Sequence, residues 1–474
     1  MSAADFRARA HDALGNAQLR GNFRRAMDGL MAKRAVQFAD AGQWQALRAR
    51  GAAVKARALA RLPDLLERFE AQATAGGIRV HWAESAEAAN RIVLDILRAH
   101  GAKRVIKGKS MVSEEMHLNA HLAAHGIEAV ESDLGEYIIQ LAGEAPSHIV
   151  MPCIHKNKAE IAQLFAERLA GLGYTEDVDA LTAAARRVLR RQFAAADAGL
   201  SGANFLVAET GSLVLVENEG NGRLSTTLPP LHIAVAGIEK VVERLVDVAP
   251  LLALLPRSAT GQPITTYVNM ISGPRKAGER DGPREVHVVL LDNGRSRVHA
   301  DAQLRDTLRC IRCGACMNHC PVYSRVGGHA YGSVYPGPIG KILTPQLAGL
   351  DCAGDLPHAS TLCNACVEVC PVQIPIADIL VRLRTEAVEP SASPAVKGAG
   401  SGAGGLEHLV WKGWAALYRS PAAYGAATRL LAWAGNLIPA AAPLLRVWTR
   451  VRTKPQFARR TLHQLARQRG YDHE

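Results

Sequence analysis

The chain has no long uncharged apolar run. The longest one near the C-terminus covers residues 430–445, which is 16 residues, and contains Asn436, Pro439 and Pro443. A helix that crosses a bilayer needs about 20 predominantly apolar residues. Residues 1–20 carry three arginines and two aspartates and no apolar segment of the kind that signal peptides have. We therefore expect no membrane span, no secretory signal and a cytoplasmic location.

Cysteine is scarce, at nine of 474 residues, and seven of the nine lie in two short runs. Small secreted domains that depend on disulfides are instead dense in cysteine and fold in an oxidising compartment. Disulfide bonds are therefore not expected, and the two runs are the first candidates for a functional site.

Positive charge is unevenly distributed along the chain. The formal net charge is +12, and residues 405–474 alone carry 11 lysines and arginines against three acidic residues. No nucleic-acid-binding module and no basic patch interleaved with stacking aromatic residues is recognisable, so we do not expect nucleic acid as a partner. The basic C-terminal region is either a solvated helix or a docking segment for a partner protein or an anionic membrane surface.

A chain of 474 residues exceeds what one hydrophobic core usually organises, so two or three domains are expected. Apolar residues at helical spacing predict helices over residues 1–75. After that point short apolar segments alternate with amphipathic ones, which is typical of a parallel β-sheet covered by helices. The expected strands are residues 78–82, 104–106, 128–130, 148–151, 232–236 and 285–291, and the expected helices are residues 86–100, 113–125 and 159–172.

A β-hairpin is expected within this region. Residues 204–208 and 212–217 are apolar strand segments that flank the turn sequence Glu209-Thr210-Gly211. A phosphate-binding P-loop is not expected, because Gly108-Lys109-Ser110 lacks the upstream glycine of that motif. The sequence thus predicts one α/β domain that ends near residue 300.

The two cysteine runs repeat one motif at a distance of 50 residues. The first run has the spacing C-x2-C-x2-C-x3-C-P of a ferredoxin-type iron–sulfur loop, and in the second run Ser360 replaces the first cysteine. In two-cluster ferredoxins the cysteine before the proline binds the other cluster, so the repeat predicts two clusters and electron transfer. A structural zinc site would need neither the third cysteine nor the proline. The runs are Cys310, Cys313, Cys316, Cys320 and Pro321, and then Cys363, Cys366, Cys370 and Pro371.

Several glycine-containing segments accompany the cysteine runs. They are residues 204–211 (NFLVAETG), 216–223 (VENEGNGR) and 237–240 (GIEK), together with His232, and residues 335–340 (YPGPIG) between the runs. Together they resemble the iron–sulfur B component of the bacterial lactate-utilisation system. The resemblance covers nearly the whole chain. It implies an electron-transfer protein that acts with companion proteins in the oxidation of L-lactate to pyruvate and is not catalytic alone.

The resemblance also implies a domain order after the helical residues 1–75. An α/β lactate-utilisation domain at residues 76–300 is similar to the NagB/RpiA/CoA-transferase-like fold of sugar-phosphate isomerases and CoA-transferases. A mainly α-helical dicluster ferredoxin-type domain follows at residues 301–388. Residues 389–405, rich in Pro, Ser, Ala and Gly, predict a flexible linker in which three glycines only mimic a dinucleotide-binding loop. A basic helical region at residues 406–474 ends the chain.

The ligands of two 4Fe-4S clusters, carried over from the family residue by residue, form two sets, and the second set is one ligand short. Three solutions are open: Ser360 at the repeat position, Cys352 eight residues before it, or a three-iron cluster. Cys153 is expected to be a buried apolar residue, and His319 receives no role. The first set is Cys310, Cys313, Cys316 and Cys370, and the second is Cys320, Cys363 and Cys366.

Three glutamates carry an alternative function. In the CoA-transferase fold a glutamate can attack a thioester, and Glu209, Glu217 and Glu219 lie at expected strand ends beside glycines whose N–H groups suit an oxyanion. The alternative is therefore a CoA-transferase-like or sugar-phosphate enzyme with redox-sensing clusters. The simpler interpretation is that the glutamates shape turns and that Arg223 binds an anion. We prefer it, because acyl transfer is an unusual companion for an electron-transfer module.

Overall fold

The computed structural model describes residues 6–388, 405–442, 446, 449 and 453–471. The chain divides into two compact units, Met1–Ser401 and Gly402–Glu474, and each is described by itself. The linker expected at residues 389–405 lies outside the described residues except for Gly405, and so do Gly400 and Gly402 of the glycine pattern.

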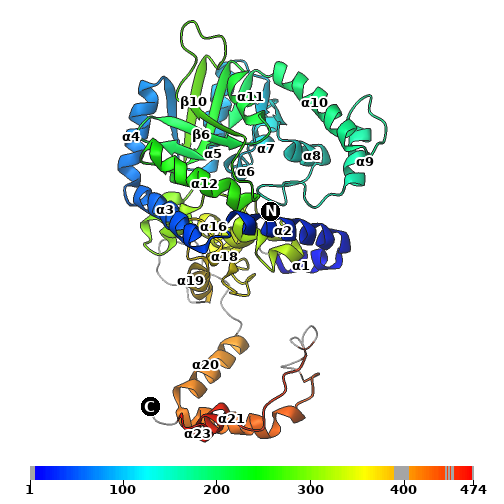
Figure 1. The fold of residues 1–474 in the computed structure, drawn as a ribbon, viewed down its shortest axis with the longest axis vertical. Coiled ribbons are helices and arrows are strands. Elements are labelled where there is room, and N and C mark those ends of the chain that lie inside the picture. Colours follow the sequence, from blue (N-terminus) through cyan, green and yellow to red (C-terminus); the bar gives the residue numbers. More distant parts are fainter. Residues whose placement is uncertain (1–5, 389–404, 443–445, 447–448, 450–452, 472–474) are drawn as a thin grey trace. The chain divides into compact units, whose positions relative to one another are not determined.

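The larger unit is built on a six-stranded parallel β-sheet (Figure 1). Its strands are β1 (Ile78–Ala83), β2 (Arg104–Lys107), β3 (Glu128–Glu131), β4 (Ala198–Ser201), β7 (Leu231–Gly237) and β10 (Glu285–Leu291). They follow the order β1-β10-β7-β4-β2-β3, and every neighbouring pair is parallel. This confirms the predicted α/β class of the N-terminal region.

Helices cover both faces of this sheet. Ile233 and Val235 of β7 share a core with α5 (Ala86–Ala99), whereas Ala234 and Ala236 share a core with α4 (Leu62–Ala75). Since successive side chains of a strand point to opposite faces, β7 is buried on both sides. The other helices of this region are α6 (Met111–Glu115), α7 (Leu118–Ala124), α8 (Leu134–Ala142), α9 (Lys158–Arg168), α10 (Val178–Ala194), α11 (Asn221–Thr227), α12 (Val248–Ala259) and α13 (Arg295–Ala300).

One predicted strand is wrong. The chain turns at residues 148–151, because His148 Nδ1 accepts hydrogen bonds from the N–H groups of Val150 and Met151 at 2.9 and 3.1 Å. The strand between β7 and β2 is instead β4, which the sequence did not predict because its small residues do not form a typical apolar strand run. Gly199 of β4 lies against the carbonyl of Ser225, and a Cβ at this position would collide with it.

A second, four-stranded sheet contains the predicted hairpin. β5 (Phe205–Val207) and β6 (Ser212–Glu217) pair antiparallel, and the turn between them includes Gly211, which has a φ of 67°. The sheet has the order β8-β5-β6-β9, completed by β8 (Val241–Val242) and β9 (Tyr267–Ile271).

The N-terminal helices pack on the cysteine segment. These are α1 (Phe6–Gly15), α2 (Ala17–Gln37) and α3 (Ala41–Ala60), as the sequence predicts. Phe23 and Met27 of α2 share a core with Tyr323 and Tyr331, so residues about 300 positions apart pack together (Figure 1). The helices of the cysteine segment are α14 (Ala315–Asn318), α15 (Tyr323–Val326), α16 (Gly337–Ala348), α17 (Leu350–Ala353), α18 (Ala365–Glu368) and α19 (Ile376–Val388).

The smaller unit contains the helices α20 (Gly405–Arg419), α21 (Pro421–Ala434) and α23 (Leu462–Gln468). Along α20 the side chains of Trp411, Trp414 and Tyr418 are exposed. Within the described part of the chain, no helix is both long and apolar enough to cross a membrane.

Candidate metal centre

The two cysteine runs fold into the same loop. The helices α14 and α18 begin 50 residues apart, as the sequence repeat does. Arg312 and Leu362 have φ of 60° and 54°, in the left-handed region. Gly314 and Asn364 enter the same region with φ of 76° and 63°. A left-handed residue on each side of the intervening cysteine curls the backbone, so that neighbouring thiols face one point.

The first set of thiols draws on both runs, with Cys313 and Cys370 buried and Cys310 and Cys316 half-buried. Burial, assisted by the nearby thiolates of Cys310 and Cys370, raises the pKa of Cys313 to about 12. The pKa of Cys316 lies well above its usual value, through burial and then the charges of Cys313 and Cys310. Cys370 is thus close to the first run, although 57 positions separate it from Cys313. The structure brings these four cysteines together, and their assignment as cluster ligands stays a prediction.

The second set of thiols lines a small cavity of its own. Cys320, Cys363 and Cys366 are among its lining residues. Burial and then the thiolate of Cys320 raise the pKa of Cys366 to about 11, whereas a hydrogen bond from the Thr361 side chain lowers the pKa of the exposed Cys363. These three residues therefore lie together, and Cys366 is also close enough to the first set for its charge to raise the pKa of Cys316, after burial and the charges of Cys313 and Cys310.

Ser360 occupies the place in the second loop that Cys310 has in the first. Its Oγ accepts a hydrogen bond from the N–H of Leu362 at 3.2 Å, and Cys310 Sγ accepts one from the N–H of Arg312 at 3.4 Å. Ser360 also lines the second cavity. Cys352 is exposed on α17 and is not among the residues that line this cavity.

Hydrogen-bond donors surround the thiols. The N–H groups of Tyr323 and Ile374 donate to the sulfurs of Cys320 and Cys370 at 3.5 and 3.3 Å. Lys341, only 1% exposed, donates through Nζ to Cys320 Sγ at 3.4 Å. Such donors stabilise the negative charge of cluster-bound thiolates and influence the reduction potential.

Two arginines of the N-terminal helices lie beside the first set. Arg34 of α2 donates to the carbonyl of Val369 at 3.3 Å. Arg48 of α3 donates to the carbonyls of Val367 and Cys370 at 2.9 and 3.2 Å. The helices α2 and α3 therefore fix the second run against the first and place positive charge beside the buried thiols.

The spacing of the thiols fits a multi-iron cluster. A single zinc ion holds each sulfur at about 2.3 Å, so its sulfur ligands lie within roughly 4.6 Å of one another. Among the described residues, which include all nine cysteines, no three cysteine sulfurs lie within 4.8 Å of one another. The compact group that one zinc ion requires is therefore not found among these cysteines, whereas a cluster with several metal atoms binds thiolates that lie farther apart.

A larger cavity of about 260 Å³ lies between the parallel sheet and the first cysteine loop. Ser110 and Asp133, which follow β2 and β3, form part of its wall, and Lys240 and Arg312 line it as well. The two cations were not singled out from the sequence. Their sequence signal is weak, because Lys240 is simply the last residue of the GIEK segment and Arg312 lies between two cysteines.

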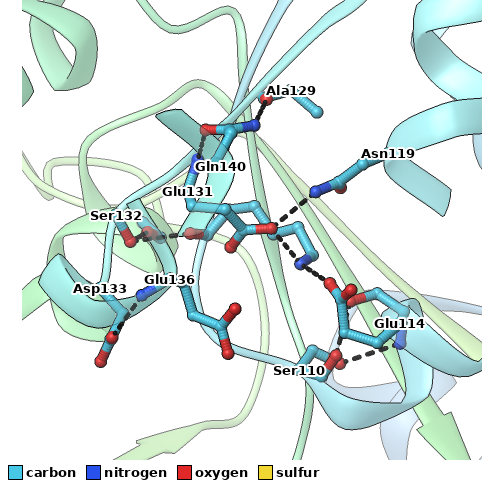
Figure 2. A network of polar contacts seen from close by, with 12 residues as sticks. Ser110, Glu114, Asn119, Ala129, Glu131, Ser132, Asp133, Glu136 and Gln140 are labelled. Atoms are coloured by element: carbon cyan, nitrogen blue, oxygen red, sulfur yellow. Dashed lines mark hydrogen bonds and ion pairs between the residues drawn. The ribbon is translucent and has the colours of Figure 1, made fainter. Parts of the chain in front are cut away.

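A buried charge network supports this wall (Figure 2). Lys107, at the end of β2, binds Glu131, and it binds Glu114 at 2.7 Å. Asn119 donates to Glu131 at 2.7 Å (Figure 2). The carboxyl group of Glu136 lies beside this network, and burial together with the charge of Glu131 raises its pKa to about 8.

The three glutamates of the alternative function hold loops. Glu217 accepts hydrogen bonds from the N–H groups of Gly222 and Arg223, both at 2.6 Å. Glu209 accepts one from the N–H of Leu245 at 2.8 Å, and Glu219 accepts one from the N–H of Asn218 at 3.2 Å. This arrangement fits the turn-shaping interpretation better than that of a nucleophile.

Two remaining candidates have ordinary surroundings. Cys153 is half-buried against the core formed by α8, α9 and α10. The Nδ1 atom of His319 lies 2.9 Å from the carbonyl oxygen of Ala315, within hydrogen-bond distance.

Comparison with known families identifies three segments. Residues 66–291 match the LUD domain, residues 306–374 match the 4Fe-4S dicluster domain, and residues 382–471 match the family "Lactate utilisation protein B, C-terminal". The 4Fe-4S dicluster match covers both cysteine runs, which supports iron–sulfur clusters as the cofactor.

Curated relatives match most of the chain. Lactate utilization protein B of Bacillus licheniformis is 44% identical over 385 residues, which cover 81% of this chain and 80% of the relative. The protein of the same name from Bacillus subtilis is 41% identical over 424 residues and 88% of both chains. An uncharacterized electron transport protein of Escherichia coli, YkgF, is 44% identical over 81% of this chain and 80% of the relative.

A solved structure of a DUF162 family protein from Deinococcus radiodurans is also similar, with 16% identity and a TM-score of 0.28 over 48% of this chain and 98% of that chain. This likeness is too weak to bear on the fold. The identity to the curated relatives is high over four fifths or more of both chains. On that ground the chain belongs to the lactate utilisation protein B family.

Proposed function

We propose that this protein is the iron–sulfur electron-transfer component of a multi-subunit system that oxidises L-lactate to pyruvate. The observation that carries the proposal is the pair of equivalent cysteine loops packed into one compact unit with the LUD domain. The names of the relatives supply the substrate. The CoA-transferase-like alternative is not favoured, because Glu217 is already engaged by two backbone N–H groups.

The proposal includes two clusters with ligands from both loops. Four cysteines would hold the first cluster, and three would hold corners of the second. The first set is Cys310, Cys313, Cys316 and Cys370, and the second set is Cys320, Cys363 and Cys366. Bound clusters of this type accept and release single electrons. The protein's own contribution is to exclude water from the first set and to offset the charge of the thiolates, with Lys341 at Cys320 and with Arg34 and Arg48 beside Cys370.

Ser360 is our candidate for the fourth corner of the second cluster. Its support is the shared hydrogen-bond pattern with Cys310 and its position in the wall of the second cavity. Cys352 has neither feature, since it is exposed on α17 and outside that wall. A serine oxygen is a weaker iron ligand than a thiolate, so this corner is also the one from which iron is lost most easily.

Companion proteins are part of the proposal, and we place the whole system in the cytoplasm. Trp411, Trp414 and Tyr418 form an exposed row on α20, with ring centroids 5.9 and 4.2 Å apart. Exposed aromatic residues beside basic ones are enriched at protein interfaces. We assign this row to contact with a companion protein. The NagB/RpiA/CoA-transferase-like fold and a helical tail also remain parts of the proposal.

Anaerobic purification followed by a reduction assay tests the function. The protein should be brown, contain up to about eight irons per chain and become reduced by lactate only when its companion proteins are present. Reduction by lactate at a catalytic rate in the absence of companions would contradict the electron-transfer assignment, and so would a colourless protein that binds one zinc ion per cysteine run.

A further inference from the structure

The cavity at the end of the parallel sheet has the place and size of a ligand site. In open α/β sheets, ligands bind outside the carboxyl ends of the strands. Ser110 and Asp133 follow β2 and β3, Ser201 ends β4, and all three line the cavity. Its volume of about 260 Å³ compares with about 10–15 Å³ for one water molecule, so a small organic molecule fits.

Lys240 presents an unpaired ammonium group to this cavity. The residue is only 6% exposed, and no described residue accepts a hydrogen bond from its Nζ. Burial and then the charge of Arg312 lower the pKa of Lys240 to about 8, so it is still largely protonated at neutral pH. A buried ammonium without a partner is costly, and an anionic oxygen in the cavity removes that cost.

Arg312 adds a second cation to the wall of the same cavity, and two of its three nitrogens have no hydrogen-bond partner among the described residues. Its Nε and Nη1 are buried and have no hydrogen-bond partner in the described part of the chain. Its one ionic contact is Nη2 with Glu239 Oε1 at 3.4 Å, and its guanidinium lies over the ring of Tyr335 at 4.5 Å. A guanidinium with free N–H groups is well suited to a carboxylate.

The nearby acidic groups are already engaged elsewhere. Glu239 binds Arg295 at 2.7 Å, and Glu115 binds the same arginine at 2.7 Å and accepts the hydroxyl hydrogen of Tyr335 at 2.6 Å. Glu217, which also lines the cavity, is held by backbone N–H groups. Glu239 offsets part of the positive charge through its contact with Arg312, but these carboxylates accept no hydrogen bond from Lys240 Nζ or from the Nε and Nη1 groups of Arg312.

The charge of the first thiol set is an alternative explanation for the two cations. Beside the larger effect of burial, negative charge on Cys310 favours the charged form of both Lys240 and Arg312, so part of their charge offsets the thiols. Thiolate charge alone leaves the Nε and Nη1 donors of Arg312 without acceptors. The backbone N–H of Arg312 meanwhile donates to Cys310 Sγ at 3.4 Å, so one residue connects the cavity with the first cysteine loop.

We propose that this cavity binds a small 2-hydroxy or 2-oxo monocarboxylate, with its carboxylate held by Lys240 and Arg312. The choice of lactate and pyruvate within that class rests on the proposed function. Binding places a negative charge next to the first cysteine loop. The bound acid therefore lowers the reduction potential of the first cluster, because reduction adds a further negative charge nearby.

Calorimetric titration of the full-length, anaerobically reconstituted protein tests the site, with pyruvate, L-lactate and inorganic phosphate as separate probes. Saturable binding of pyruvate or lactate is expected. Lys240→Met and Arg312→Gln should each weaken the affinity for the acid about tenfold or more. A loss of this size corresponds to one charge-assisted hydrogen bond. A redox titration followed by paramagnetic resonance should show that pyruvate lowers the potential of the first cluster and leaves that of the second unchanged.

Arg309→Gln is the matched control. Arg309 precedes Cys310 as Arg312 follows it, but it pairs with Asp306 at 2.6 Å and does not line the cavity. This variant should bind the acids as the unmodified protein does. Iron content is measured for every variant. Because Lys240 lies outside the cysteine loops, Lys240→Met keeps the test valid if Arg312→Gln loses its first cluster.

Three results would overturn the site: no saturable binding of either acid, equal binding by Lys240→Met and the unmodified protein, or tighter binding of phosphate than of both acids. The companion-dependent reduction assay separates this failure from that of the proposed function. Intact reduction by lactate without binding here would move the substrate site to a companion protein. Binding here without companion-dependent reduction would instead contradict the electron-transfer role.

Discussion

The two cysteine loops share a backbone but not an environment. In the first loop, Cys313 and Cys320 are buried, and the loop packs against α3, α12 and the cavity at the sheet. In the second loop Cys363 is exposed, and the residues around it face the surface. The first loop also has a cysteine at the position where the second has Ser360. Duplication thus preserved the fold of the loop while burial and ligand type diverged.

This difference gives the two proposed clusters different tasks. A set of four thiolates without an exposed member favours a stable cluster, whereas a set with one exposed thiol and a serine favours a labile cluster whose potential responds to solvent. The first cysteine loop lies next to the cavity with Lys240 and Arg312, and Cys363 of the second loop is exposed. In the proposed function, electrons would enter beside the cavity and leave at the second loop.

Removing a cysteine has the largest expected effect. Cys313→Ala should abolish the first cluster and about half of the iron, and Cys370→Ala should damage the same cluster, because the two thiols lie together. Cys366→Ala should damage the other cluster. Iron analysis and paramagnetic resonance measure both effects, with Cys153→Ala as the unaffected control. Loss of different clusters in Cys313→Ala and Cys370→Ala would break the crossed assignment.

Changing Ser360 tests the main chemical difference between the loops. Ser360→Cys restores the residue of the first loop and should raise the iron content toward about eight per chain. Ser360→Ala should increase the fraction of a three-iron form in the oxidised protein, as seen by Mössbauer and paramagnetic resonance spectra. Cys352→Ala should change neither cluster. Loss of iron in Cys352→Ala, with full iron in Ser360→Ala, would assign the fourth corner to Cys352.

Lys341 offers a finer test, because its ammonium group contacts a cysteine of only the second set, Cys320. Lys341→Met removes the ammonium group that donates to Cys320 Sγ, so the potential of the second cluster should fall by on the order of 50–100 mV. The potential of the first cluster should stay unchanged. Arg48→Gln is the counterpart beside Cys370 and should shift only the first cluster. Equal shifts of both clusters in either variant would show that the two sets do not have separate environments.

The cysteine chemistry was predictable from the sequence because its signal is local. Fixed spacing and a 50-residue repeat indicate the loops and the replacement at Ser360 without any tertiary information. The strands with regular apolar runs were likewise predictable. β4 was missed, because it relies on Gly199 fitting against the Ser225 carbonyl, and residues 148–151 were assigned wrongly, because the His148 side chain turns the chain.

The cavity could not be predicted in the same way. It depends on residues from the sheet region and the cysteine segment that meet only after folding. Lys240 belongs to a short segment with a family pattern, and Arg312 lies between two cysteines, so neither cation stands out in the sequence. Their significance comes from the burial of Lys240 and from the two buried Arg312 nitrogens without a hydrogen-bond partner, which are properties of the tertiary structure alone.

Changing Glu136, which lies beside the charge network that supports the cavity wall, should leave both cysteine loops intact. It should alter the stability of the fold instead. Burial raises the pKa of Glu136 to about 8, so the ionised carboxylate is disfavoured in the folded state. The unmodified protein therefore loses stability as the pH rises from about 4.5 to 8, and Glu136→Gln does not share this loss. The variant should be more stable by a few kcal/mol at pH 8–9 and nearly equal at pH 4.

Denaturant unfolding at several pH values measures this difference. Glu144→Gln is the control with the opposite sign, because hydrogen bonds from Lys156 and His155 lower the pKa of Glu144 despite its partial burial. That variant should lose stability near pH 7 and regain equality with the unmodified protein in acid. A Glu136→Gln variant with no advantage at pH 9 would show that the Glu136 carboxylate is ionised without cost.

The smallest expected effect concerns the aromatic row on α20, whose proposed role is contact with a companion protein. Trp411→Ser and Trp414→Ser should leave iron content and both potentials unchanged and lower companion-dependent lactate oxidation a few-fold, because each removes exposed aromatic contact area. Trp433→Ser on α21 is a matched control, since Trp433 is 80% exposed and outside the row. The assay is run at low and physiological salt, because the adjacent Lys412 and Arg419 should make the contact salt-sensitive. If all three variants keep full activity at both salt concentrations, or bind anionic vesicles less well with no change in activity, the row does not contact a companion protein.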